Sequence, residues 1–299
     1  METPFVVGAD GSDASLTATD WAADEAVRLR GPLRIVNASR WEWYEGSVPP
    51  WSLNRPSGQV LAENIAATAA ERARRRAPGL KVTTDVLIED AASALVKEGR
   101  SAAAVVVGSR GRSELADLLL GSVGLIVAAR SHGPVIVVRG DRHALEARHR
   151  RVLLGIGEHD VDSPAVRFAF REAAFRQVEL DVVRAWRRPA HEPVDHLLLP
   201  GGASHYEEQQ ATMLLDKAVE AAVRAHPEVR LRRTTVEGPA HKTLVERSVA
   251  ADLLVVGARR LEVHVGMELG RVAYRALHHA ACPVAVVPQG HGAPIRGER

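Results

Sequence analysis

The sequence predicts an α/β protein built of two tandem, doubly wound (Rossmann-like) domains, each with a five-stranded parallel sheet flanked by helices. Two observations lead to this class. Short runs of β-branched and apolar residues alternate with longer segments of helical periodicity, which is the pattern of a parallel sheet with crossover helices. The second half also repeats the first, because three turn residues recur after 149 positions. They are Gly108, Gly121 and Pro134, matched by Gly257, Gly270 and Pro283.

Length and composition narrow the class of protein. The chain has 299 residues, of which 46% are hydrophobic and 25% charged, as in ordered globular domains. Its net charge of +2 does not indicate nucleic acid or an anionic membrane as a partner. The single cysteine, Cys282, excludes an internal disulfide and fits a reducing compartment. No secretory signal is visible and no apolar run approaches about 18 residues, so we expect a cytoplasmic protein without a membrane partner.

Residues 1–140 are expected to form the first domain. Its strands are expected at 5–7, 33–36, 82–88, 105–107 and 135–138, and its helices at 15–29, 60–76, 91–99 and from Gly121 onward. Residues 40–59 are expected to be a loop that carries Trp41, Trp43, Tyr44 and Trp51. These rings either cover a ligand or pack against the sheet edge or the sister domain, and the sequence leaves both open.

The polar segment 141–150 is expected to be a linker, followed by a second domain at 151–290 and a tail at 291–299. The second domain should hold strands at 152–154, 180–183, 229–236, 253–256 and 284–287, and helices at 164–176, 205–225 and 243–249. The similarity of WAADEA, from Trp21, to FAFREA, from Phe168, supports the duplication. Each domain ends in an apolar strand, and such an edge needs covering.

Two turns of the first domain are the best candidates for a binding site. One follows the first strand and contains Asp10, and the other follows the fourth strand and begins at Gly108. In a doubly wound sheet, ligands bind beyond the carboxyl ends of the strands, where the strand order reverses, so these turns should converge on one pocket. Gly108 and Gly111 would let the backbone approach a ligand, and the helix that opens at Ser122 favours an anion at its N-terminus.

The same residues also allow purely structural interpretations, in which none of them binds a ligand. The glycines could form a plain strand-to-helix turn, and Ser122 could serve only as a helix N-cap. Asp10 could simply make an Asx-type turn with Ser12, and Arg110 could be a solvated side chain. The residues alone therefore argue for an anion-binding turn in an α/β domain.

The spacing Gly108-x-x-Gly111, nine residues, then Gly121-Ser122 resembles the ATP-binding signature of the universal stress protein family. The turn from Val6 to Ser12 resembles that family's acidic opening, and the whole chain resembles its tandem members. The resemblance implies ATP as the ligand, with or without Mg²⁺. It also implies that the last strands of two domains pair, either between the halves of this chain as a pseudo-dimer or in a homodimer.

The resemblance also implies a role for each site residue. Gly111, Gly121, Ser122 and the amide of Val123 would cradle the phosphates, beside the turn that Gly108 begins. The Ser122 hydroxyl would bind a phosphate oxygen or a Mg²⁺-bound water. Arg110 would pair with phosphate or ribose, Asp10 would meet the adenosine end, and the backbone of Ala38 would meet adenine. Asn37 stands where family members often have histidine.

The second half departs from the signature at two positions that should face phosphate. Arg260 replaces the second glycine, and Arg271 rather than a hydroxyl residue follows Gly270. The acidic opening is also altered, at residues 155–160. We therefore expect the second domain to keep the fold but to bind ATP weakly or not at all. The opposing interpretation is that the two arginines make cationic phosphate contacts of a different geometry.

These observations predict an ATP-binding stress-response protein that acts as a nucleotide-dependent switch and not as an enzyme. One alternative is a slow ATPase or nucleotidyl-handling enzyme, for which Asp10 and Asp117 are the only nearby acids and no lysine lies in the motif. Another is an interaction scaffold without nucleotide. The chain has neither GxxxxGK[ST] nor GxGxxG, and its 13 histidines are too dispersed to indicate a metal site.

Overall fold

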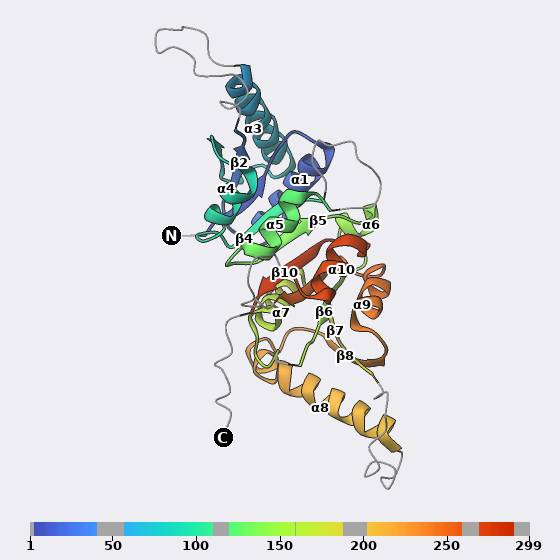
Figure 1. The fold of residues 1–299 in the computed structure, drawn as a ribbon. Helices are drawn as coiled ribbons and strands as arrows, with labels where there is room; N and C mark the ends of the chain where they lie inside the picture. Colours follow the sequence, from blue (N-terminus) through green and yellow to red (C-terminus); the bar gives the residue numbers. More distant parts are fainter. Residues whose placement is uncertain are drawn as a thin grey trace.

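The computed structural model describes residues 3–40, 57–109, 120–158, 160–187, 202–258 and 269–289, with side chains from 205 onward in the fifth range. They form one ten-stranded sheet with helices on both faces (Figure 1). The aromatic loop, Arg110, Gly111, Asp117, Arg260 and the tail at 291–299 lie outside the described residues. No helix in the described ranges is long and apolar enough to cross a membrane.

The first half contributes one half of this sheet. Its strands lie in the order β3-β2-β1-β4-β5 and are parallel, as predicted. The elements are β1 (Phe5–Gly8), α1 (Asp13–Arg28), β2 (Leu33–Ala38), α3 (Ser57–Arg76), β3 (Val82–Leu87), α4 (Ala91–Glu98), β4 (Ala104–Gly108), α5 (Ser122–Arg130) and β5 (Val135–Val138). Helix α3 begins three residues before the predicted start at residue 60. Its first three residues are not buried, so they contribute no apolar residue to the helical pattern in the sequence.

The second half repeats the arrangement in the order β8-β7-β6-β9-β10. Its elements are β6 (Arg151–Gly155), α7 (Pro164–Arg176), β7 (Glu179–Trp186), α8 (Gly202–Ala225), β8 (Leu231–Glu237), α9 (Ala240–Ser248), β9 (Leu253–Ala258), α10 (Arg271–His279) and β10 (Val284–Pro288). The segment expected to be a plain linker contains a short helix, α6 (Arg142–Leu145). Asp141 caps this helix, because its side chain accepts a hydrogen bond from the amide of Ala144 at 2.9 Å.

The two halves join through their last strands. β5 and β10 pair antiparallel, with Ile136 opposite Ala285 at the middle of the register. Both apolar edges are therefore covered by each other, which removes the exposed strand edge that either half alone would present. In Figure 1 this seam lies at the centre, with α3 and α8 at the two outer ends. The predicted pairing of last strands is thus confirmed as a contact between the halves of one chain.

Each face of the sheet carries its own hydrophobic core. Helices α1, α3, α7 and α8 cover one face, and α4, α5, α9 and α10 cover the other. The central strands are buried on both sides, which explains why β4 and β9 read as unbroken apolar runs rather than as alternating patterns. This double cover leaves the carboxyl ends of the strands as the place where a ligand can reach the sheet.

Cys282 provides a test of how tightly the seam is closed. It lies just before β10, is fully buried, and its burial raises the pKa of the thiol far above the ordinary value. We expect a thiol reagent such as DTNB to leave the native protein unmodified and to titrate one thiol per chain in denaturant. Rapid modification without denaturant would contradict this packing.

Candidate functional site

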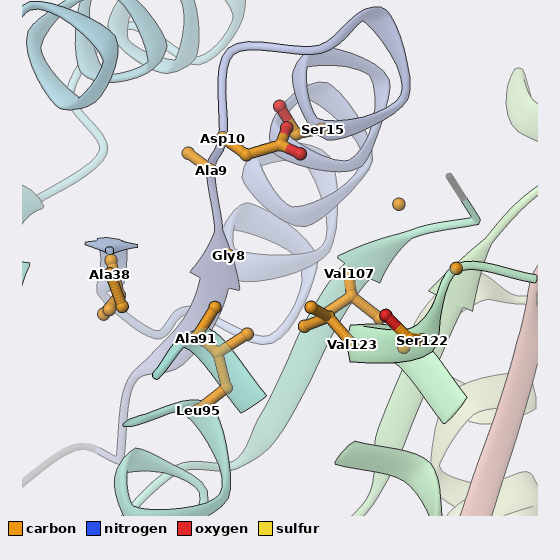
Figure 2. Close-up of a pocket in the computed structure, with 14 residues that line it drawn as sticks. Gly8, Ala9, Asp10, Ser15, Ala38, Ala91, Leu95, Val107, Ser122 and Val123 are labelled. Carbon is orange, nitrogen blue, oxygen red and sulfur yellow. The ribbon is translucent and has the colours of Figure 1, made fainter. Parts of the chain in front are cut away.

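A cavity of about 280 Å³ lies at the carboxyl ends of β1, β2 and β4, between α4 and α5 (Figure 2). It lies beside β1 and β4, where the strand order of the first half reverses. The structure brings together at this cavity the predicted site residues that it describes. They are Asp10, Ala38, Gly108, Gly121, Ser122 and Val123.

The acidic turn after β1 is held by its own hydrogen bonds. Asp10 Oδ1 accepts hydrogen bonds from the amide of Ser12 at 3.0 Å and from its hydroxyl at 2.6 Å. Ser12 in turn caps α1 by accepting from the amide of Ser15 at 3.2 Å. The Asx-type turn is therefore present, and the same carboxylate lines the cavity. Its local role and a ligand-facing role are compatible.

Gly108 is required by the packing of the protein on itself. A Cβ at this position would lie 2.7 Å from the carbonyl carbon and oxygen of Ala14 and 3.0 Å from the amide nitrogen of Ser15. The sequence predicted that this glycine would admit a ligand to the backbone. The structure shows that an added side chain would meet the first turn of α1, and Gly108 also lines the cavity, so the approach of its backbone to a ligand stays a prediction.

The N-terminus of α5 supplies the polar end of the cavity. Gly121 is the N-cap, with extended backbone angles and no side-chain capping bond, and Ser122 is the first helical residue. The interpretation of Ser122 as the N-cap is therefore wrong. Its side chain is exposed at the cavity, and the first amides of a helix have no partner within the helix, which favours an anion there.

The opposite end of the cavity is apolar. Val36, Ala38, Ala91 and Leu95 line it, and Figure 2 shows Ala38 on the side away from Ser122. Ala91 and Leu95 were not among the predicted site residues, although α4 follows a strand and so begins at the same edge of the sheet. A flat, apolar molecule with an anionic group would match both ends of this cavity.

Asn37 supports the cavity from behind. It is buried, and its Nδ2 donates to the carbonyl oxygen of Ala9 at 2.7 Å, which ties β2 to the acidic turn. Its counterpart in the second half is Arg184, whose Nη1 donates to the carbonyl oxygen of Ile156 at 3.3 Å. The same backbone support is thus made by a much longer, cationic side chain in the second half.

The second half differs from the first around Gly257, near the end of β9. A Cβ on Gly257 would lie 2.0 Å from Gln289 Nε2, so a side chain occupies the space that the backbone of α1 takes in the first half. That amide donates to Asp160 Oδ1 at 2.9 Å and to Ser163 Oγ at 3.4 Å. Gln289 therefore fastens the end of β10 to the turn before α7.

A later helix start explains why Gln289 fits there. In the repeat, Asp160 corresponds to Asp13, the first residue of α1, but α7 begins only at Pro164, about one turn later. Among the residues that the structure describes, no helical turn covers Gly257 as the first turn of α1 covers Gly108. Arg271 is the exposed first residue of α10, in the place of Ser122, so the altered signature is accompanied by an altered backbone.

The comparison with known proteins agrees with this duplicated architecture. The pattern of the Universal stress protein family matches residues 1–139 and 148–288. The chain belongs to this family. Universal stress protein Rv2005c of Mycobacterium tuberculosis (strain H37Rv) is 34% identical over 293 residues, covering 95% of this chain and 96% of that protein. A universal stress protein of Mycolicibacterium smegmatis is 31% identical over 301 residues, covering 96% and 97%.

A solved structure shows the same fold at low sequence identity. The universal stress protein from Archaeoglobus fulgidus DSM 4304 superposes with a TM-score of 0.71 at 17% identity, covering 96% of this chain and 98% of that chain. This universal stress protein thus has the tandem form seen in relatives of similar length. Its two family domains share a fold but differ in the residues around Gly108 and Gly257.

Proposed function

We propose that this universal stress protein is an ATP-binding regulatory protein whose first domain holds its one nucleotide site. The observation that carries the proposal is the cavity that joins the N-terminus of α5 to an apolar slot beside Ala38. Phosphate suits the helix N-terminus, and adenine suits the apolar slot.

The residues present fit such a ligand. The amides of Ser122 and Val123 and the hydroxyl of Ser122 would hold phosphate oxygens, and Ser122 could equally meet a Mg²⁺-bound water. Gly121 would shape this turn, because its own amide already donates to the carbonyl oxygen of Ser109 at 2.9 Å. Asp10 would accept from the ribose with its carboxylate, and the backbone of Ala38 would meet the adenine edge. Arg110 and Gly111 belong to the same proposal through the sequence signature alone.

The arrangement favours binding over hydrolysis. Asp10 is the only ionisable side chain among the described residues that line the cavity, and its Oδ1 is engaged by two hydrogen bonds from Ser12, which gives it a structural role in the turn. We therefore propose a nucleotide-dependent switch and not an enzyme. Release of phosphate measured beside binding would distinguish the slow-ATPase alternative.

We expect isothermal titration with ATP to give one nucleotide per chain. Ser122→Ala should lower the affinity about three- to tenfold, because it removes one hydrogen bond to a charged group. Arg271→Ala changes the corresponding first residue of α10 and should leave both the stoichiometry and the affinity unchanged.

Two outcomes would count against this assignment. Two nucleotides per chain, with the second lost in Arg271→Ala, would show that the arginines of the second domain make a site of their own. No binding of ATP by protein freed of co-purified nucleotide would overturn the proposed function and favour the scaffold alternative.

A further inference from the structure

A histidine of the second domain contacts the residue that immediately precedes the polar end of the first domain's cavity. His278, in α10, is only 5% exposed, and its Nδ1 accepts a hydrogen bond from the amide of Leu120 at 3.4 Å. Leu120 immediately precedes Gly121, the N-cap of α5. This contact therefore ends one residue from the backbone that the proposed function assigns to phosphate.

The imidazole is held on several sides. The ring of Tyr274 lies 4.3 Å from it, centre to centre, one helical turn earlier in α10. The side chain of Arg139, just after β5, donates through Nη1 to the carbonyl oxygen of Leu277, the residue next to His278. α10 is thus fastened to the first domain at two neighbouring points, and His278 has little freedom to leave Leu120.

The chemistry of the ring agrees with an acceptor role. Burial lowers the pKa of His278, and the charges of His279, Arg139 and Arg275 lower it further, so the neutral form is favoured. A neutral imidazole that carries its proton on Nε2 leaves Nδ1 free to accept from the Leu120 amide. Nε2 itself is buried and has no hydrogen-bond partner among the described residues.

The repeat does not supply this contact twice. The residue of the first domain that corresponds to His278 is Ala129, in α5, which has no side-chain acceptor to offer the second domain. The contact therefore serves only the domain whose cavity keeps the nucleotide signature. The two halves therefore share a fold, but the second domain supports the site of the first domain without a matching contact in return.

We propose that His278 is a positioning residue for the nucleotide site of the first domain: through the Leu120 amide it fixes the N-cap of α5 and the phosphate-binding backbone that follows. The inference rests on the proposed function and gives the second domain a part in it. The side chain of Leu120 is buried against the first turn of α5: its Cδ1 lies 3.2 Å from where a Cβ on Gly124 would stand. Packing therefore holds this residue in addition to the hydrogen bond from its amide. Donors that are held before the ligand arrives cost less ordering on binding.

Three substitutions in the full chain separate hydrogen bonding from packing. His278→Asn places an acceptor oxygen where Nδ1 lies, His278→Leu fills the space without an acceptor, and His278→Ala removes both. We expect Leu and Ala to weaken ATP binding about three- to tenfold and to speed hydrogen exchange of the Leu120 amide in the nucleotide-free protein. Asn should stay near wild type in both measurements, as should the control His279→Ala, which alters the exposed neighbour in α10.

The outcomes separate the positioning role of His278 from the proposed function. If wild type binds ATP and both His278→Leu and His278→Asn bind it with the wild-type affinity, the positioning role is wrong and the proposed function stands. If Ala fails to fold by circular dichroism, the comparison of Leu with Asn still decides. If wild type itself does not bind ATP, the proposed function fails, and this inference fails with it.

Discussion

Replacing Gly108 with alanine is expected to weaken ATP binding by at least about tenfold while the second domain stays intact. The new Cβ would stand 2.7 Å from backbone atoms of Ala14, and a backbone cannot swing aside as a flexible side chain can. The first turn of α1 would have to shift, and the Asp10 turn would move with it, because Ser12 joins the two. Forcing an extra methyl group into packed surroundings costs about 1–3 kcal/mol, which here falls on the site itself.

Gly257→Ala is the matched control for this substitution. It occupies the corresponding position of the second domain, but its Cβ would meet the far end of the Gln289 side chain, which can rotate away. We expect ATP affinity to be unchanged in Gly257→Ala, with a loss of thermal stability because moving Gln289 breaks its hydrogen bonds to Asp160 and Ser163. Titration calorimetry and thermal unfolding of both variants make the comparison, and equal affinity in Gly108→Ala and wild type would show that the cavity does not hold the nucleotide.

The features that could be predicted from sequence depend on local pattern or on repetition. Strands such as β4 and β9 are apolar throughout because helices cover both faces of the sheet, so their composition marks them directly. The antiparallel seam of β5 and β10 followed from the resemblance to a family in which last strands pair. Asp10 and Gly108 could be placed at one cavity because parallel strands bring their carboxyl ends to the same edge.

The features that could not be predicted depend on tertiary neighbours. The start of α7 at Pro164 could be predicted, but the side chain that fills the space before it could not, because Gln289 lies 129 positions after its partner Asp160. The contact of His278 with Leu120 spans 158 positions and has no counterpart in the repeat to reveal it. Sequence patterns report which face of an element is buried, but they do not report which distant side chain completes a site.

The interface between the halves also buries a set of charges that the repeat alone does not explain. Glu25 in α1 and Glu172 in α7 occupy corresponding positions, and both are buried. Arg176 reaches both: its Nη2 lies 2.6 Å from Glu25 Oε2 and its Nε 3.3 Å from Glu172 Oε2. Arg28 adds a second cation at 2.9 Å from Glu25 Oε2. Two acids thus share mainly one buried base.

The two carboxyl groups respond to this environment in opposite directions. Burial raises the pKa of Glu172 well above its ordinary value, and the charge of Glu25 raises it further. Burial is the largest single influence on Glu25 and opposes its ionisation, but the charge of Arg176, the hydrogen bond from Glu172 and the contact with Arg28 together outweigh it and hold the pKa of Glu25 below its ordinary value. A protonated Glu172 can donate to Glu25, which would satisfy carboxyl oxygens that otherwise lack a partner among the described residues.

This arrangement fixes the sign of a pH dependence. The contribution of Glu172 to stability is fully present below its unfolded pKa of about 4.5 and is lost as pH rises through its higher folded value. Glu25 acts in reverse, since its contribution is present above 4.5 and is lost as pH falls through its lower folded value. Glu172→Gln should therefore raise stability on the alkaline side, by about 1.4 kcal/mol for each unit of pKa elevation that it removes.

Arg176→Met is expected to cost about 3–5 kcal/mol of unfolding free energy at pH 7, because it leaves a buried carboxylate without its main partner. Urea denaturation measures this loss, and Arg75→Met is the control: it breaks an exposed pair with Glu71 and should cost under about 1 kcal/mol. Neutralising both acids as well, with Glu25→Gln and Glu172→Gln, should recover much of the loss, since no buried charge is then left unpaired. Equal costs for Arg176→Met and Arg75→Met would mean that water reaches the cluster and that the halves are held together by the β5–β10 seam without it.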